Sequence, residues 1–223
     1  MNSASLLYEN SEILLVNKPA GVSVQGGAGV SHPLDKELSA QLGYQVCLVH
    51  RLDKDTAGIL VVAKNPVAAA KWIKLLQDSR VKKEYAAVLL GIPCINGKHC
   101  LKGTLRGEVE AHGRVQDAET HYTIEKSCAL PETSGEVVLS LARITLGTGR
   151  MHQIRIQMAH AGAPVAADDQ HGNFKQNKLV RKLGIRKLQL AAVKLTLPLD
   201  GGQRTFEIPL PQHIQSVVDT LLC

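Results

Sequence analysis

The chain has 223 residues, of which 44% are hydrophobic, and a formal net charge of +6. A chain of this length and composition can bury a substantial core as one domain, and its moderate positive charge suits a polyanionic partner without requiring one. No apolar run is long enough to span a bilayer and the N-terminus lacks a secretory pattern, so we expect a cytoplasmic protein without a membrane partner.

Short runs rich in Val, Ile and Leu predict the strands. Because strands outnumber helices and do not alternate regularly with them, the fold class is predicted as α+β with a mixed, largely antiparallel sheet. The expected strands are Ile13–Val16, Ile59–Ala63, Tyr85–Leu90, His121–Ile124, Val137–Thr145, Leu190–Leu197 and Thr205–Ile208.

Helices are predicted at three places between and after these strands. Asn65 and Pro66 supply an N-cap and an N1 proline for a helix through about Leu76. A second helix is expected over Met151–Ala161, with Gly162 as its C′ residue. The final helix opens at Pro211 and places one apolar stripe toward the core, made of Ile214, Val217, Val218, Leu221 and Leu222.

Two polar clusters are candidates for chemistry. The segment His50–Gly58 stands directly before an apolar strand, and taken alone it is typical of a capped turn. The segment Gly147–Arg155 leads from a strand through a glycine turn into a helix, whose first amides favour an anion that could be a simple carboxylate. Arg155 follows His152 by about one turn, so we expect it on the same face as the helix N-terminus.

Together these clusters resemble the motifs of the RluA family of pseudouridine synthases. His50–Gly58 (HRLDKDTAG) is similar to the family's nucleophile loop, and Gly149–Arg155 (GRMHQIR) is similar to its helix-opening motif. Three further segments are similar to its lysine-proline motif, its K-x-Y strand and its D-x-x-Y/H-G turn, namely Asn17–Gly21, Lys83–Tyr85 and Asp168–Gly172. Residues 1–223 are accordingly expected to form a single, two-lobed pseudouridine synthase catalytic domain around a central cleft, without the S4 RNA-binding domain that many relatives carry.

The resemblance implies a role for each residue of the catalytic set. Asp53 would be the nucleophilic carboxylate and Arg155 the cation that keeps it ionised. Tyr85 would stack on the uracil and transfer a proton, although stacking alone or a place in the core would also account for it. Arg51 would fill the gap left by the flipped uridine, with a structural salt bridge as the alternative.

The implied reaction breaks the N1–C1′ bond of uridine, rotates the retained uracil and forms a C5–C1′ bond. Attack of Asp53 on C1′, attack on C6, and a glycal route that begins with deprotonation of C2′ stay open, and we favour the glycal route. Because no redox change or phosphate hydrolysis occurs, neither a metal nor an organic cofactor is expected.

RNA is the expected partner, either ribosomal or transfer RNA, and a monomer is the expected state. The segment Phe174–Lys187 holds six basic residues and no acid, which is typical of a solvated helix face and, beside an RNA-modifying site, favours phosphate contacts. The residues predicted to bind RNA are Arg51, His50, Thr56, Arg150, Lys175, Lys178, Arg181 and Lys182. For His50 and His152 the pattern also fits an ordering of the loops.

The sequence departs from the family pattern at some positions, and two other functions are compatible with its motifs. Met151 stands where the family commonly has Ser or Thr, and Ala57 replaces a frequent Ser, which bears on substrate fit more than on chemistry. The chain could instead be a catalytically inactive RNA-binding protein on the same scaffold. It could also be an N-glycoside hydrolase with Asp55 as the second carboxylate, in which case free uracil would be released.

Overall fold

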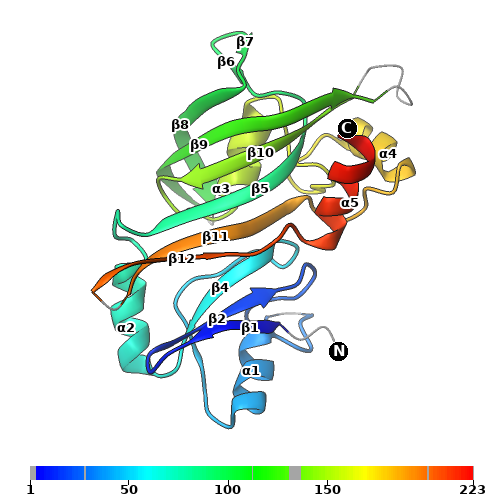
Figure 1. Cartoon of the computed structure of the whole chain (residues 1–223). Helices are drawn as coiled ribbons and strands as arrows, with labels where there is room; N and C mark the ends of the chain where they lie inside the picture. The colour runs from blue at the N-terminus through cyan, green and yellow to red at the C-terminus, as the bar shows by residue number, and fades with distance from the viewer. Residues whose placement is uncertain (1–3, 28, 112, 131–136, 200, 223) are drawn as a thin grey trace. The chain divides into compact units, whose positions relative to one another are not determined.

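The computed structural model describes residues 4–27, 29–111, 113–130, 137–199 and 201–222 (Figure 1). The chain divides into two units. The first comprises Met1–Lys83 and Ala192–Pro209, and the second comprises Glu84–Ala191 and Leu210–Cys223. The division leaves the predicted single catalytic domain untested.

The first unit is built on a sheet whose strand order is β1-β2-β4-β11. Strand β12 pairs with β11, and the short β3 pairs with β4. Strand β4 is apolar throughout and all of its residues are buried, as expected of an interior strand. The strand bounds are β1 Ser5–Glu9, β2 Ile13–Lys18, β3 Cys47–Leu48, β4 Ala57–Ala63, β11 Leu190–Leu199 and β12 Gly202–Glu207.

Two helices belong to the first unit. Helix α2 (Pro66–Leu75) begins where the sequence predicts, because the side chain of Asn65 accepts a hydrogen bond from the Ala68 amide. Its Trp72 is buried and donates its indole N–H to Glu12 over 2.8 Å. Helix α1 (Leu34–Leu42) was not predicted, since its N-cap position holds Pro33 without a side-chain capping bond.

The second unit contains an antiparallel sheet of order β5-β10-β9-β8. Strand β8 was not predicted and β9 is much longer than expected, because many of their residues are polar and exposed and give no apolar run. A small hairpin, β6 with β7, stands apart from this sheet. The strand bounds are β5 Lys82–Leu90, β6 Cys94–Ile95, β7 Lys98–His99, β8 Lys102–Ala111, β9 Arg114–Ala129 and β10 Val138–Leu146.

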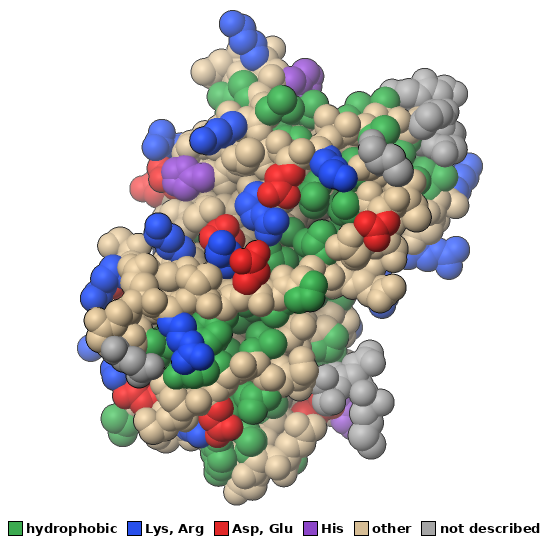
Figure 2. Space-filling view, viewed as in Figure 1, with side chains coloured by type: hydrophobic (Ala, Val, Ile, Leu, Met, Phe, Trp, Pro, Cys, Tyr) green, Lys and Arg blue, Asp and Glu red, His purple; other side chains and the backbone are tan. Residues whose placement is uncertain are grey.

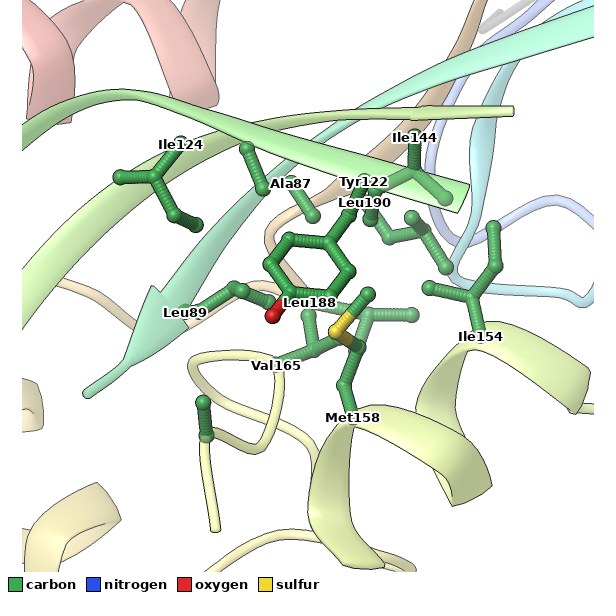
Figure 3. Packing of buried hydrophobic residues seen from close by; sticks show 12 residues of the cluster. Ala87, Leu89, Tyr122, Ile124, Ile144, Ile154, Met158, Val165, Leu188 and Leu190 are labelled. Carbon is green, nitrogen blue, oxygen red and sulfur yellow. The ribbon is translucent and has the colours of Figure 1, made fainter. Parts of the chain in front are cut away.

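Helix α3 (Gln153–His160) packs its apolar side chains against this sheet (Figure 3). Ile154 and Met158 meet Tyr122 and Ile144 in one buried cluster, and the Tyr122 hydroxyl donates to the Cys100 carbonyl. Since Ile154 and Met158 are one turn apart, their burial fixes the rotation of the helix and therefore the direction of Arg155 between them.

The remaining helices are α4 (Phe174–Lys182) and α5 (Gln212–Leu221), both in the second unit. The final helix starts next to Pro211 as predicted, and Ile214, Val217 and Val218 are buried. The α+β class with a largely antiparallel sheet is confirmed. Among the described residues, the helices are too short or too polar to cross a membrane.

Candidate active site

In the first unit, the loop that carries Asp53 is held by the buried side chain of Lys18. The Lys18 ammonium donates to the backbone carbonyls of Pro19, Val22 and Lys54 over 3.0, 2.8 and 2.9 Å. The Gly21 amide donates to the same Lys54 carbonyl over 2.9 Å. The lysine-proline motif therefore fixes the backbone directly after Asp53.

The electrostatics of Lys18 follow from its burial. Desolvation lowers the pKa of Lys18 to about 8, while the charges of Asp55 and Asp53 act in the opposite direction. Three carbonyl acceptors match the three N–H donors that only the charged ammonium has. The three carbonyls and the two aspartates thus favour the charged ammonium of Lys18. This ammonium supplies positive potential to the Asp53 loop.

His50, at the start of the loop, is bound to the neighbouring strand. Its Nε2 accepts a hydrogen bond from the Val61 amide over 2.9 Å, which requires the neutral ring with the proton on Nδ1. Burial, with a smaller contribution from the charge of Lys83, lowers the pKa of His50 to about 3. The ring therefore orders the loop, which is the structural function that the sequence left open.

The other predicted residues of this loop differ in exposure. Arg51 is exposed, whereas Thr56 is only 3% exposed. The Thr56 amide donates to the Asp53 carbonyl over 3.1 Å, closing a tight turn around the proposed nucleophile. The Thr56 hydroxyl is buried and has no hydrogen-bond partner among the described residues.

In the second unit, Arg155 forms a two-pronged ion pair with Asp168. Its Nε donates to Asp168 Oδ2 over 2.7 Å and its Nη2 donates to Asp168 Oδ1 over 2.8 Å. The side chains are only 10% and 1% exposed. The sequence had assigned Arg155 to Asp53 alone, and it gave no signal that a second carboxylate neutralises this buried guanidinium.

Asp168 also organises the turn that follows it. Its Oδ1 accepts hydrogen bonds from the amides of Gln170 and His171, each over 3.0 Å. Burial alone would raise the pKa of Asp168, but the hydrogen bonds from Arg155 and from these amides outweigh it and lower the pKa. The carboxylate is therefore ionised at neutral pH, as the ion pair requires.

Two residues beside the Arg155–Asp168 pair have a left-handed backbone conformation although they are not glycine. His152, the N-cap of α3, has φ +53°, and Ala167, directly before Asp168, has φ +60°. His152 Nδ1 and His171 Nε2 are 2.9 Å apart in a ring-to-ring hydrogen bond. Left-handed conformations at residues other than glycine cost about 1–3 kcal/mol each and persist where the surroundings enforce them, often at functional sites.

The two other predicted residues of this region lie on strand and loop. Tyr85 on β5 is half-buried and packs against the apolar cluster beneath α3. Arg150 is exposed, and its Nε donates to the Asp117 carbonyl over 3.2 Å. Tyr85 is the cross-strand partner of Ile144 and therefore lies on the same face of the sheet, whereas Arg150 reaches solvent.

Helix α4 carries the predicted basic surface. Lys175, Lys178 and Lys182 are exposed, while Arg181 forms an ion pair with Asp169. Figure 2 shows Lys and Arg side chains projecting at the edge of the molecule where Figure 1 places α4. The lysines, more than Arg181, are therefore available to a polyanion.

Sequence comparisons relate the chain to known RNA-modifying enzymes. A family model described as RNA pseudouridylate synthase matches residues 12–160, which include Asp53, Tyr85 and Arg155. The chain is 31% identical over 229 residues to ribosomal large subunit pseudouridine synthase C of Escherichia coli (strain K12), covering 97% of this chain and 69% of that protein. It is 30% identical over 237 residues to ribosomal large subunit pseudouridine synthase D of Salmonella typhimurium, covering 97% and 70%.

Solved structures show the same fold. The human protein named RNA Pseudouridylate Synthase Domain Containing 4 matches with a TM-score of 0.74 and 22% identity, covering 96% of this chain and 92% of that one. Human RNA Pseudouridylate Synthase Domain Containing 1 matches with a TM-score of 0.71 and 21% identity, covering 99% and 95%. The predicted pseudouridine synthase fold is thereby confirmed.

Proposed function

The chain belongs to the RNA pseudouridylate synthase family, and from that premise we propose that it isomerises uridines of large-subunit ribosomal RNA with Asp53 as its nucleophile. The family makes it an RNA pseudouridine synthase, an isomerase, as the resemblance to the RluA family implied. The choice of ribosomal over transfer RNA is supported by the relatives at about 30% identity, whose names are those of large-subunit enzymes.

The observation that carries the role of Asp53 is the fixed backbone of its loop. Lys18 and Gly21 both bind the Lys54 carbonyl, and the Thr56 amide binds the carbonyl of Asp53 itself. A carboxylate on such a turn is held for attack without further ordering when substrate binds. The N1–C1′ bond of uridine breaks, the uracil rotates and a C5–C1′ bond forms. C5 then loses its proton to solvent and N1 takes up a proton, so that the product is an isomer of the substrate.

Arg155 and Tyr85 complete the proposed catalytic set. Arg155 supplies positive charge that favours the ionised nucleophile, and its ion pair with Asp168 keeps the guanidinium in one orientation. Tyr85 offers a ring face to the uracil and a hydroxyl for proton transfer. The half-buried state of Tyr85 supports stacking, since packing against the cluster beneath α3 holds its ring.

Contacts to RNA are proposed for the exposed basic residues. Arg51 fills the place of the flipped uridine, and Arg150, Lys175, Lys178 and Lys182 bind phosphates. Arg181 does so in competition with Asp169. An ordering of the Asp53 loop in place of direct contact with RNA is supported for His50 by its hydrogen bond from the Val61 amide and for Thr56 by its burial.

The organisation, oligomeric state and location of the protein belong to the same proposal. Both units act as one catalytic domain, the protein works as a monomer, and it works in the cytoplasm on RNA. Size-exclusion chromatography with light scattering tests the monomer, because a dimer would elute at twice the mass of the 24.1 kDa chain.

Tritium release from C5-labelled RNA tests the function. Ribosomal and transfer RNA transcribed without modifications are incubated with the intact protein, with Asp53→Asn and with Asp55→Asn. Asp55 is the matched control because it is an exposed carboxylate two residues away. We expect release from ribosomal RNA by the intact protein and by Asp55→Asn, and none by Asp53→Asn.

Each other result has a definite meaning. Release by Asp53→Asn removes Asp53 from the nucleophile's role. Release from transfer RNA alone overturns the choice of substrate. Binding of both RNAs without release would support an inactive RNA-binding protein, and release of free uracil would indicate a hydrolase.

A further inference from the structure

Phe174 is an exposed aromatic residue at the first position of α4. Its side chain is 78% exposed, although burying a phenylalanine stabilises a fold by about 1.5–3 kcal/mol. The chain's other phenylalanine behaves differently, since Phe206 lies 5.0 Å from the ring of Tyr8 and under the guanidinium of Arg204. Among the described residues, no ring or cation stacks on Phe174, so its face is open to a partner.

Helix α4 is tied to the turn that holds Arg155. Asn177 is buried, its Nδ2 donates to the Asp168 carbonyl over 2.8 Å, and its Oδ1 accepts from the Ala167 amide over 3.0 Å. Phe174 precedes Asn177 by three residues, so the two lie on adjacent turns of the same side of the helix. The position of Phe174 is therefore fixed relative to the Arg155–Asp168 pair within the second unit.

The surroundings of Phe174 are basic. Lys175 and Lys178 are exposed on the same helix, within one turn of the phenylalanine. The two acids shortly before α4 are already paired, Asp168 with Arg155 and Asp169 with Arg181. An open aromatic face beside exposed ammonium groups matches a partner that carries flat rings along a chain of negative charges.

We propose that Phe174 is a stacking platform for an unpaired nucleobase of the RNA substrate, with Lys175 and Lys178 on the adjoining phosphates. Unpaired bases stack on exposed aromatic side chains in RNA-binding proteins, with little dependence on base identity. The inference rests on the proposed function, because it takes RNA as the partner. It adds a base contact outside the reacting uridine, on the helix that braces Asp168.

Two polyanions separate stacking from charge. Oligouridylate of 12 nucleotides presents unpaired bases and phosphates, whereas heparin presents anions without bases. Affinity for each is measured by fluorescence anisotropy and by competition, using the intact protein, Phe174→Ala, Phe174→Tyr and Lys175→Ala/Lys178→Ala. Leu101→Ala is the matched control, because Leu101 is an apolar side chain that is 57% exposed in the same unit.

We expect Phe174→Ala to weaken oligouridylate binding by about fivefold to 150-fold, and to leave heparin binding unchanged. Phe174→Tyr should retain the affinity because it keeps the ring, and Leu101→Ala should match the intact protein. The double lysine variant should weaken binding of both polyanions.

Unchanged oligouridylate binding by Phe174→Ala would overturn the proposal. So would an equal loss on oligouridylate and heparin, because that pattern indicates a disturbed helix. The result does not depend on catalysis: absence of tritium release by the intact protein would refute the proposed activity and leave the comparison of the two polyanions to decide the role of Phe174.

Discussion

The ammonium of Lys18 and the backbone carbonyl of Lys54 are joined by a 2.9 Å hydrogen bond, although 36 positions separate them in the chain. This bond connects the end of β2 to the turn that carries Asp53. It explains why a lysine stands in a fully buried position, since each of its donors has a carbonyl acceptor. The lysine acts on the nucleophile through the backbone of its loop.

Replacing Lys18 by methionine keeps the volume but removes all three donors. The carbonyls of Pro19 and Val22 then lose their Lys18 partner, and we expect the free energy of unfolding to fall by about 2–4 kcal/mol. Urea unfolding measures this loss. Tritium release by the folded variant should fall while RNA affinity changes little, because the loop is released and the basic helix is untouched.

Lys54→Met is the control for that change, since Lys54 is exposed and contributes only its backbone carbonyl to the bond. It should keep near-normal stability and turnover. Equal stability of Lys18→Met and Lys54→Met would contradict the assigned function of Lys18.

His50 should make the fold sensitive to acid. Its pKa is about 3 in the folded chain and ordinarily 6.5, so between these values the unfolded chain binds the proton and the folded chain does not. Stability from this residue is fully present above pH 6.5 and is lost as the pH falls toward 3, by about 2 kcal/mol at pH 5. His50→Gln keeps an acceptor for the Val61 amide and should abolish this part of the loss of stability between pH 7 and pH 5, as measured by urea unfolding. An unaltered pH dependence would refute the assignment.

Removing the charge of Asp168 should be more damaging than removing a surface carboxylate. In Asp168→Asn the buried Arg155 keeps its charge and loses its two-pronged ion pair with the Asp168 carboxylate, so we expect a loss of about 3–5 kcal/mol in unfolding free energy. Asp169→Asn is the matched control because Asp169 is exposed and its pair with Arg181 lies at the surface, where such pairs are worth at most about 1 kcal/mol. Thermal and urea unfolding compare the two, and similar losses would argue against the buried ion pair as a structural element.

Gly58, at the start of β4, should not tolerate a side chain. Its φ is +114°, and a Cβ there would lie 2.1 Å from the carbonyl oxygen of Ala192. We expect Gly58→Ala to lower the free energy of unfolding by about 3 kcal/mol or more. Gly202→Ala, with open space around the added carbon, should change it by less than about 1 kcal/mol; comparable values for both variants would show that the close approach is relieved without cost.

Local chemistry made several elements predictable. Asn65 followed by Pro66 is a sufficient start for α2, because the capping bond and the fixed proline φ act within four residues. The buried strand β4 and the apolar stripe of α5 follow from hydrophobic pattern alone. Strand β8 gave no such pattern, since many of its residues are polar and exposed and, among those described, only Leu105 and Val109 contribute apolar side chains to the interior.

The sequence by itself determined the family, the α+β class and the candidate residues Asp53, Tyr85 and Arg155, because these depend on motifs of adjacent residues. Only the tertiary structure decided that Lys18 holds the Asp53 loop and that Arg155 pairs with Asp168, an aspartate beyond the end of its helix. Ion pairs and hydrogen bonds are short-range interactions between side chains and carbonyls that chain folding brings together, so spacing along the sequence does not specify them.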